Sequence, residues 1–186
     1  MISPEQNAQI DFTPSNFLGS LFLVVKTVLL SPGFFYEKMK TEGGLRNPLI
    51  FLICCVLIHT LIVSLFVAKP TIIIFNLING ILMPFVTAGI LFFIITRLFK
   101  ASGTYELSLR VNAYAAATAL FSWIPVIGLL LQLYRFYLIA LGLSRTFSIK
   151  LSQSFLAIAI TVVIYIVTLG PIMSYILGGQ PPPPVP

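Results

Sequence analysis

Long apolar runs, separated by short polar segments, constrain the fold of this chain more than any other feature. The sequence has 186 residues, of which 58% are hydrophobic and only 9% are charged. In a typical soluble domain roughly a quarter of the residues are charged. A helix that crosses a bilayer needs about 20 predominantly apolar residues. The runs therefore predict one all-α integral membrane domain.

The apolar runs predict a bundle of five transmembrane helices within a membrane domain over residues 17–177. The predicted spans are residues 48–67, 72–99, 107–124, 127–143 and 155–177. The second run would be about 42 Å long as a helix, which exceeds the ~30 Å hydrocarbon core. Pro84 has no backbone N–H and its ring collides with the carbonyl of Gly80. We therefore expect a kink between Gly80 and Pro84.

The third and fourth runs are the shortest, and they meet at a turn that contains Pro125 and Gly128. As helices they would be about 27 and 25 Å long, nearly enough for two full spans. The alternative is a re-entrant hairpin that enters and leaves at the same face. Both interpretations leave an odd number of crossings, so the predicted sides of the other loops do not change.

The segments that flank the spans are predicted to stay outside the hydrocarbon core. Residues 1–16 read as a disordered cytoplasmic tail, and residues 178–186 as a Pro-rich, polyproline II tail. Residues 17–46 are predicted to form short amphipathic helices at the interface. Phe17–Leu30 has apolar residues at helical spacing, but it is too short to cross and contains Lys26. Ser31-Pro32 is a typical start of a second helix.

The basic residues predict the orientation, because nine of the eleven fall on one predicted side. The nine are Lys26, Lys38, Lys40, Arg46, Arg97, Lys100, Arg110, Arg145 and Lys150. Only Lys69 lies on the other side, and Arg135 is inside a run. The positive-inside rule then predicts a cytoplasmic N-terminus and an extracytoplasmic C-terminus in the cell (inner) membrane.

The same distribution of charge indicates the kind of partner. The bases flank apolar runs instead of alternating with aromatic residues, which argues against a nucleic-acid partner. We expect membrane lipids as partners, with anionic headgroups at the cytoplasmic face. A membrane-protein partner or a homo-oligomer is also compatible with the sequence.

Arg135 is the main candidate for a binding residue, because it lies in the middle of the fourth run. A central Arg costs about 2.5–3.5 kcal/mol on the lenient insertion scale, so it should face the bundle interior or water. All five acidic residues lie outside the spans, which leaves neutral polar partners. The expected cluster comprises Arg135, Asn76, Asn79, Gln132 and Tyr114, with carbonyl groups freed near Pro84. Arg135 either contacts an anion or headgroup, or is structural and snorkels or binds carbonyl groups.

The sequence does not contain the patterns that usually carry catalysis or bind a metal. It has no plausible Ser/His/Asp set, no pair of carboxylates and no Gly-rich phosphate loop. Its one His, His59, follows Cys55 by four residues, and two ligands do not complete a zinc site. We therefore expect no catalytic residues, no metal and no cofactor.

Several short motifs occur in an order that is typical of one membrane family. They are Ser31–Phe35, Gly43–Leu49, Leu109–Ala115, Trp123–Gly128 and Leu141–Leu143. In this order they resemble the YIP (Ypt-interacting protein) family over roughly residues 20–177. The resemblance implies five membrane helices and a cytoplasmic N-terminus. Eukaryotic members carry a long N-terminal region and are associated with Rab-type GTPases, whereas this chain resembles the short prokaryotic type.

Two functions agree with these features. The first is a non-enzymatic membrane scaffold or a protein that binds protein or lipid partners. The alternative is a channel or carrier for a small solute or anion, built around the Pro84 kink and Arg135. A polar lumen would favour the alternative.

Overall fold

A computed structural model describes residues 9–67 and 69–178, with the side chains of the last helix described as far as Thr168. The described residues are helical apart from loops and one isolated bridge between Ile10 and Met39, so the all-α class is confirmed. The α-helices are α1 (Phe17–Leu30), α2 (Pro32–Lys38), α3 (Arg46–Ser64), α4 (Pro70–Leu98), α5 (Tyr105–Ala115), α6 (Ile127–Thr146) and α7 (Leu151–Gly178). Two 3-10 segments, η2 (Pro14–Asn16) and η3 (Ala116–Phe121), complete the order.

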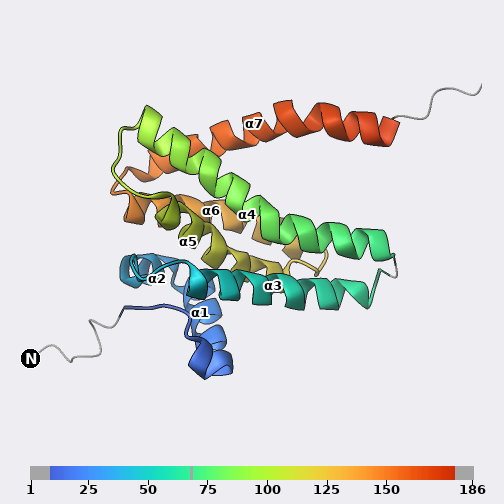
Figure 1. Ribbon diagram of the computed structural model, residues 1–186, viewed down its shortest axis with the longest axis horizontal. Coiled ribbons are helices and arrows are strands. Elements are labelled where there is room, and N and C mark those ends of the chain that lie inside the picture. Colours follow the sequence, from blue (N-terminus) through green and yellow to red (C-terminus); the bar gives the residue numbers. More distant parts are fainter. Residues whose placement is uncertain (1–8, 68, 179–186) are drawn as a thin grey trace, which may run out of the picture.

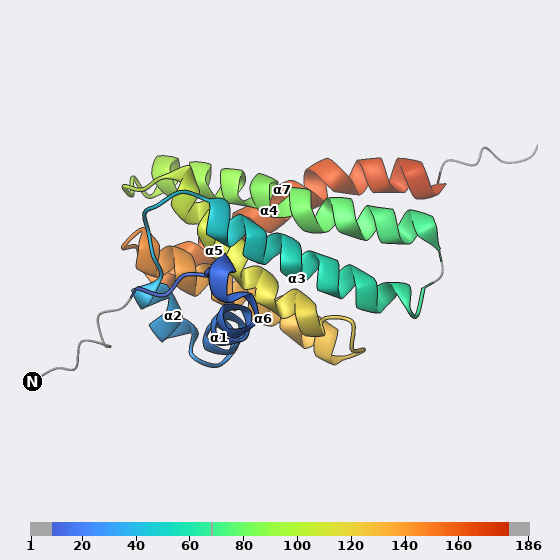
Figure 2. The same cartoon turned by 60° about the horizontal axis from the view of Figure 1, so that its bottom comes forward.

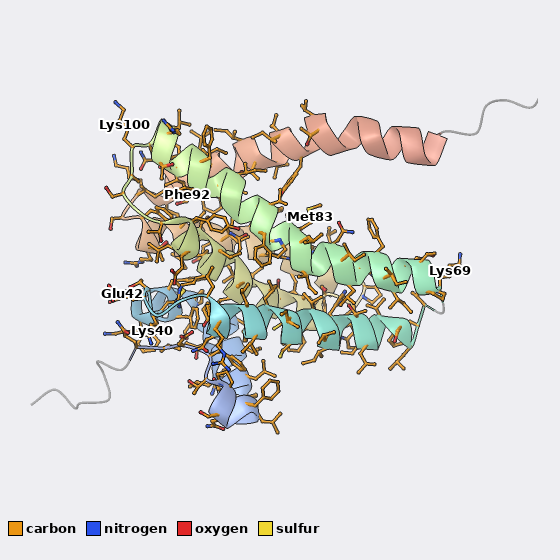
Figure 3. All side chains as sticks on the ribbon, viewed as in Figure 1. Lys40, Glu42, Lys69, Met83, Phe92 and Lys100 are labelled. Carbon is orange, nitrogen blue, oxygen red and sulfur yellow. The ribbon has the colours of Figure 1, made fainter. Side chains whose placement is uncertain are left out.

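Four helices among the described residues are long and apolar enough to cross a membrane. They are α3, α4, α6 and the part of α7 up to Thr168. They run along the long axis of the molecule (Figures 1 and 2). Lys40, Glu42 and Lys100 lie at one end of this axis and Lys69 at the other (Figure 3). We call the first the basic end and the second the far end.

The predicted third span differs most from the sequence-based expectation. Residues 107–124 contribute to α5 and then directly to η3, and neither is among the four long apolar helices. α5 carries polar side chains such as Ser108, Arg110 and Asn112, and all three are buried. Because α3, α4 and α6 pack around α5, its polar side chains face protein and not lipid. α5 is also short, with 11 residues, so it is not among the four long apolar helices.

Small side chains allow α5 and η3 to occupy the middle of the bundle. Ala113, Ala115, Ala116 and Ala117 are at most 1% exposed, and small residues let helix backbones approach closely. The 3-10 geometry of η3 also lengthens this element, since it rises about 2.0 Å per residue instead of 1.5 Å. Together α5 and η3 extend over about 28 Å. Trp123 then stacks on Phe66, with ring centroids 5.9 Å apart, next to the end of α3.

α4 bends near its middle, where Figure 3 labels Met83, and Pro84 lies inside this helix. Pro84 cannot donate a hydrogen bond to the carbonyl four residues earlier, which is a common cause of such bends. Gly80 has a different role, because a Cβ there would lie 2.7 Å from Cγ1 of Val56. Gly80 thus permits close packing of α4 on α3. α4 and α7 diverge toward the far end of the molecule (Figure 1).

Arg110 joins α5 to the loop between α2 and α3. Its side chain is fully buried, and its Nε lies 3.1 Å from Oε1 of Glu106. It also donates to the carbonyl of Lys40 at 2.9 Å, of Glu42 at 3.0 Å and of Gly44. Gly44 has a φ of +78°, which glycine adopts without steric cost. The loop therefore turns its carbonyl groups onto one guanidinium.

Residues 9–16 differ from the disordered tail that the sequence predicts for residues 1–16. Phe12 is fully buried in the core, and its N–H donates to the hydroxyl of Tyr114 at 3.2 Å. The same hydroxyl donates to the carboxylate of Asp11, which also accepts from the side-chain amide of Asn47 at 3.1 Å. This segment is therefore fastened to α3 and α5. Residues 1–8, and the predicted polyproline tail after Gly178, lie outside the described residues.

α1 lies across the direction of the long helices (Figures 1 and 2) and packs against α2. Its outward side chains are mostly apolar, since Leu18, Phe22 and Leu30 are 71–77% exposed, and Lys26 is exposed as well. Its buried positions include Ser20 as well as Val24. An amphipathic helix at the interface, as the sequence analysis expects, stays a prediction. An outward apolar face requires lipid or another protein to cover it.

Replacing Arg110 tests whether it organises the basic end. Arg110→Ala should lower the free energy of unfolding by about 3 kcal/mol, because Glu106 and the loop carbonyls lose their shared partner. Arg110→Lys should restore only part of this, since an ammonium group lacks the planar fork. Denaturant unfolding in detergent micelles measures both. Arg145→Ala, at an exposed position near the end of α6, is the control, and an equal effect there would contradict the assignment.

The attachment of the N-terminal segment can be tested separately. Tyr114→Phe removes one hydroxyl and leaves the Phe12 N–H and Asp11 short of a partner, so stability should fall by about 1–3 kcal/mol. Proteolysis within residues 9–13 should also become faster. Tyr137→Phe removes a hydroxyl from an exposed tyrosine on α6 and should change neither quantity. Unchanged proteolysis in Tyr114→Phe would show that other contacts hold the segment.

Candidate functional site: a cavity at Arg135

A cavity of about 370 Å³ lies among α4, α5, α6 and α7, in the middle part of the bundle. Its lining is mostly apolar and contains no acidic residue. The polar residues of the lining are Thr87, Asn112, Gln132, Arg135, Thr161 and Tyr165. The apolar residues are Met83, Leu91, Phe136, Ile139, Ile158, Val162 and Ile166.

The cavity lies beside the bend of α4. Met83, Thr87 and Leu91 follow one another at intervals of four residues, so they share the face of α4 on which the cavity lies. Pro84 is the neighbour of Met83 on the same helix. α4 and α7 pack together, but the two helices diverge toward the far end (Figure 1).

Most neutral polar groups of the cavity are already paired within the protein. The Thr87 hydroxyl lies 2.7 Å from the Met83 carbonyl and 2.7 Å from the Tyr165 hydroxyl. Because Thr87 has one proton and the carbonyl can only accept, Tyr165 is the donor to Thr87. Thr161 donates to the carbonyl of Ala157 at 2.9 Å, and Asn112 donates to that of Ser108 at 2.9 Å. These bonds hold the wall of the cavity in place.

Arg135 differs from these groups, because it lines the cavity and its guanidinium donates to no acceptor among the described residues. The nearby Tyr36 of α2 supplies no charge. Burial raises the pKa of Tyr36, as does the adjacent Tyr134, while the positive charge of Arg135 acts in the opposite direction. Tyr36 therefore stays neutral, and the charge of Arg135 has no counter-ion in the cavity lining.

The structure brings together two members of the expected polar cluster and separates the other three. Gln132 and Arg135 both line the cavity. Asn79 donates to the carbonyl of Phe75 on its own helix at 2.8 Å, and Asn76 does not line the cavity either. Tyr114 is bonded to Asp11. Sequence distance and polarity alone did not indicate which face of each helix these residues occupy.

Four polar residues of the cavity were missed by the sequence analysis: Thr87, Asn112, Thr161 and Tyr165. A usable signal existed for two of them, because Thr161 and Tyr165 are four residues apart and share one face of an otherwise apolar helix. Asn112 lies inside the Leu109–Ala115 motif, but its chain position gives no indication that it faces Arg135.

A metal site is not indicated elsewhere in the described part of the chain. Within residues 9–67 and 69–178 no group of three or more His, Cys, Asp and Glu side chains could hold an ion. Cys54 and Cys55 are free thiols. The Nδ1 atom of His59 lies 3.3 Å from the hydroxyl of Ser122, so this imidazole binds the loop after η3.

Comparison with known proteins places the chain in a family. The Yip1 domain family matches residues 26–181. No curated protein and no solved structure gives a significant match. Proteins of the matched family are membrane proteins and are not known as enzymes. The match spans most of the sequence, and its helices include four that are apolar enough to cross a membrane. The chain therefore belongs to the Yip1 domain family of membrane proteins.

Proposed function

We propose that this is a non-enzymatic membrane scaffold of the cell (inner) membrane that binds anionic lipid at its basic end. The observation that carries the proposal is the outward apolar face of α1, which lies across the bundle and packs on α2, η3 and α5. In this arrangement α1 inserts its exposed Leu18 and Phe22 side chains into the acyl chains of one leaflet. Lys and Arg side chains at that end then attract anionic headgroups.

In this proposal the chain crosses the membrane five times, with α5 and η3 as the third crossing. Three observations support it. The element is about 28 Å long, close to the thickness of the hydrocarbon core. Trp123 stacks on Phe66, and Ser122 lies 3.3 Å from the ring of His59 on α3. The loop after η3 therefore shares the far end with the α3–α4 turn, which argues against a re-entrant hairpin.

The orientation in this proposal follows from the distribution of basic residues between the two ends of the bundle. Figure 3 has Lys40 and Lys100 at one end and Lys69 at the other. With the basic end in the cytoplasm, the N-terminus is cytoplasmic and α7 carries the chain to the extracytoplasmic side.

Cysteine labelling tests the third crossing. In a Cys54→Ser, Cys55→Ser background, Ser122→Cys should react with a membrane-impermeant maleimide added from outside. Ser102→Cys, in the loop at the basic end, should react only after the membrane is opened. If Ser122→Cys also required opened membranes, the hairpin would be the correct topology.

Selective lipid retention tests the lipid-binding role. Protein purified in mixed phosphatidylcholine and phosphatidylglycerol micelles should retain phosphatidylglycerol preferentially, and added salt should reduce this. The variant with Lys100, Arg145 and Lys150 each changed to Gln should lose up to about a hundredfold of this preference, since each base near an anionic surface contributes about 1 kcal/mol. Lys69→Gln is the control at the far end. Equal loss in both variants would contradict a basic-end site.

One observation favours a second function, a carrier or channel for a small solute or anion. The cavity holds an arginine without a counter-ion at mid-depth, beside the bend of α4. Anion flux into proteoliposomes that requires Arg135 would support this function. Against it, the cavity is mostly apolar and no polar path to either end is present among its lining residues.

A further inference from the structure

We propose that the Arg135 cavity binds the carboxylate of a single-chain amphiphile, of the fatty-acid class, that enters sideways from the membrane. This site lies on α4, α5, α6 and α7, away from the basic end, so it does not depend on the lipid binding proposed above. The proposed binding also does not require that the protein transport its ligand across the membrane.

The charge of the site selects a monoanion. Arg135 is the only charged residue among the described residues of the lining, and a charge at membrane depth without a partner is unfavourable. A guanidinium and a carboxylate form two parallel hydrogen bonds and cancel one another's charge. A phosphate monoester would bring nearly two negative charges and leave one of them buried without a partner. The match in charge and in planar shape therefore indicates a carboxylate.

The lining of the site selects an apolar tail. Met83, Ile139 and Val162 line it together with other large apolar side chains, which contact hydrocarbon well and a small hydrated anion poorly. The volume of about 370 Å³ lies near the lower end of the range for ligand pockets. Such a space suits the head and the adjoining segment of one chain, and not a two-chain phospholipid.

The rim of the site indicates the direction of entry. Phe136 is 40% exposed and Ile166 65% exposed, and both line the cavity. In a membrane these exposed apolar side chains contact lipid. α4 and α7 also diverge toward the far end (Figure 1). A ligand that passes between them reaches Arg135 from the hydrocarbon phase, with its tail still among the lipid chains.

Binding of radiolabelled oleate to the purified protein in phosphatidylcholine nanodiscs tests the proposal. The unmodified protein should bind one oleate per chain in a saturable manner. Arg135→Gln should weaken binding at least about tenfold, because it removes a charge-assisted pair. Arg135→Lys should give an intermediate affinity, and Lys69→Gln, at the far end, should bind normally. Normal binding by Arg135→Gln would overturn the proposal.

A second variant separates the cavity from the charge. Val162→Phe keeps Arg135 and fills part of the cavity, so it should also weaken oleate binding. Without oleate, the unfolding midpoint of Arg135→Gln should be no lower than that of the unmodified protein, because the lost charge had no partner. Added oleate should raise the midpoint of the unmodified protein and not that of Arg135→Gln. A large drop in the midpoint without oleate would show that Arg135 is structural and would count against the proposal.

Competing ligands identify the chemistry that the site recognises. Oleyl alcohol lacks the anion and acetate lacks the chain, so neither should displace oleate at equal concentration. Phosphatidylglycerol in the nanodisc should not displace it either. Displacement by acetate would indicate a small-anion site, and displacement by phosphatidylglycerol a headgroup site. Either result would overturn the assignment to a single-chain carboxylate.

Discussion

The burial of α5 and η3 in the centre of the bundle determines how the other helices are arranged. α3, α4 and α6 pack directly on α5, and its alanine-rich continuation η3 lets α3 and α6 approach the same axis. Enclosure by protein removes the need for an apolar surface, so this element can carry polar residues at membrane depth. Two of these polar residues have distinct roles. Arg110 organises the basic end, and Asn112 lines the cavity.

The fully buried Arg110 and the half-buried Arg135 show opposite solutions to the same physical problem. Arg110 is satisfied by one carboxylate and three carbonyl groups, and it fixes a loop that two glycines allow to turn. Arg135 has no such set, although the neighbouring hydroxyl groups of Thr87 and Tyr165 bond to each other and to the backbone. The fold is thus able to satisfy a buried guanidinium completely, and it does so only where the role is structural.

The sequence predicted helical segments at α3, α4, α6 and α7 and in the protein-enclosed segment of α5 and η3, and it missed the packing of residues 9–16. Hydropathy identifies α3, α4, α6 and α7 because lipid contact requires an apolar surface, although the observed α7 begins at Leu151 and not at residue 155. It fails for the buried Phe12, since a long-range contact with Tyr114 holds a segment that looks like a tail. The position of Arg135 in a cavity could be foreseen from its cost in lipid. The residues around Arg135 could not be foreseen. The rotation of each helix about its own axis depends on packing against other helices, which no local sequence pattern records.

The bend at Pro84 lies beside the site of the proposed ligand. A proline within a helix removes a hydrogen bond and is unfavourable by itself, and here it lies beside Met83, which lines the cavity together with Arg135. An apolar residue at position 135 would remove an unpaired charge, and replacements of this kind are often neutral or stabilising. The retention of an unpaired guanidinium at an apolar cavity is explained by an anionic ligand with an apolar tail. The guanidinium provides its counter-ion, so that binding itself restores the electrostatic balance that the protein alone does not reach.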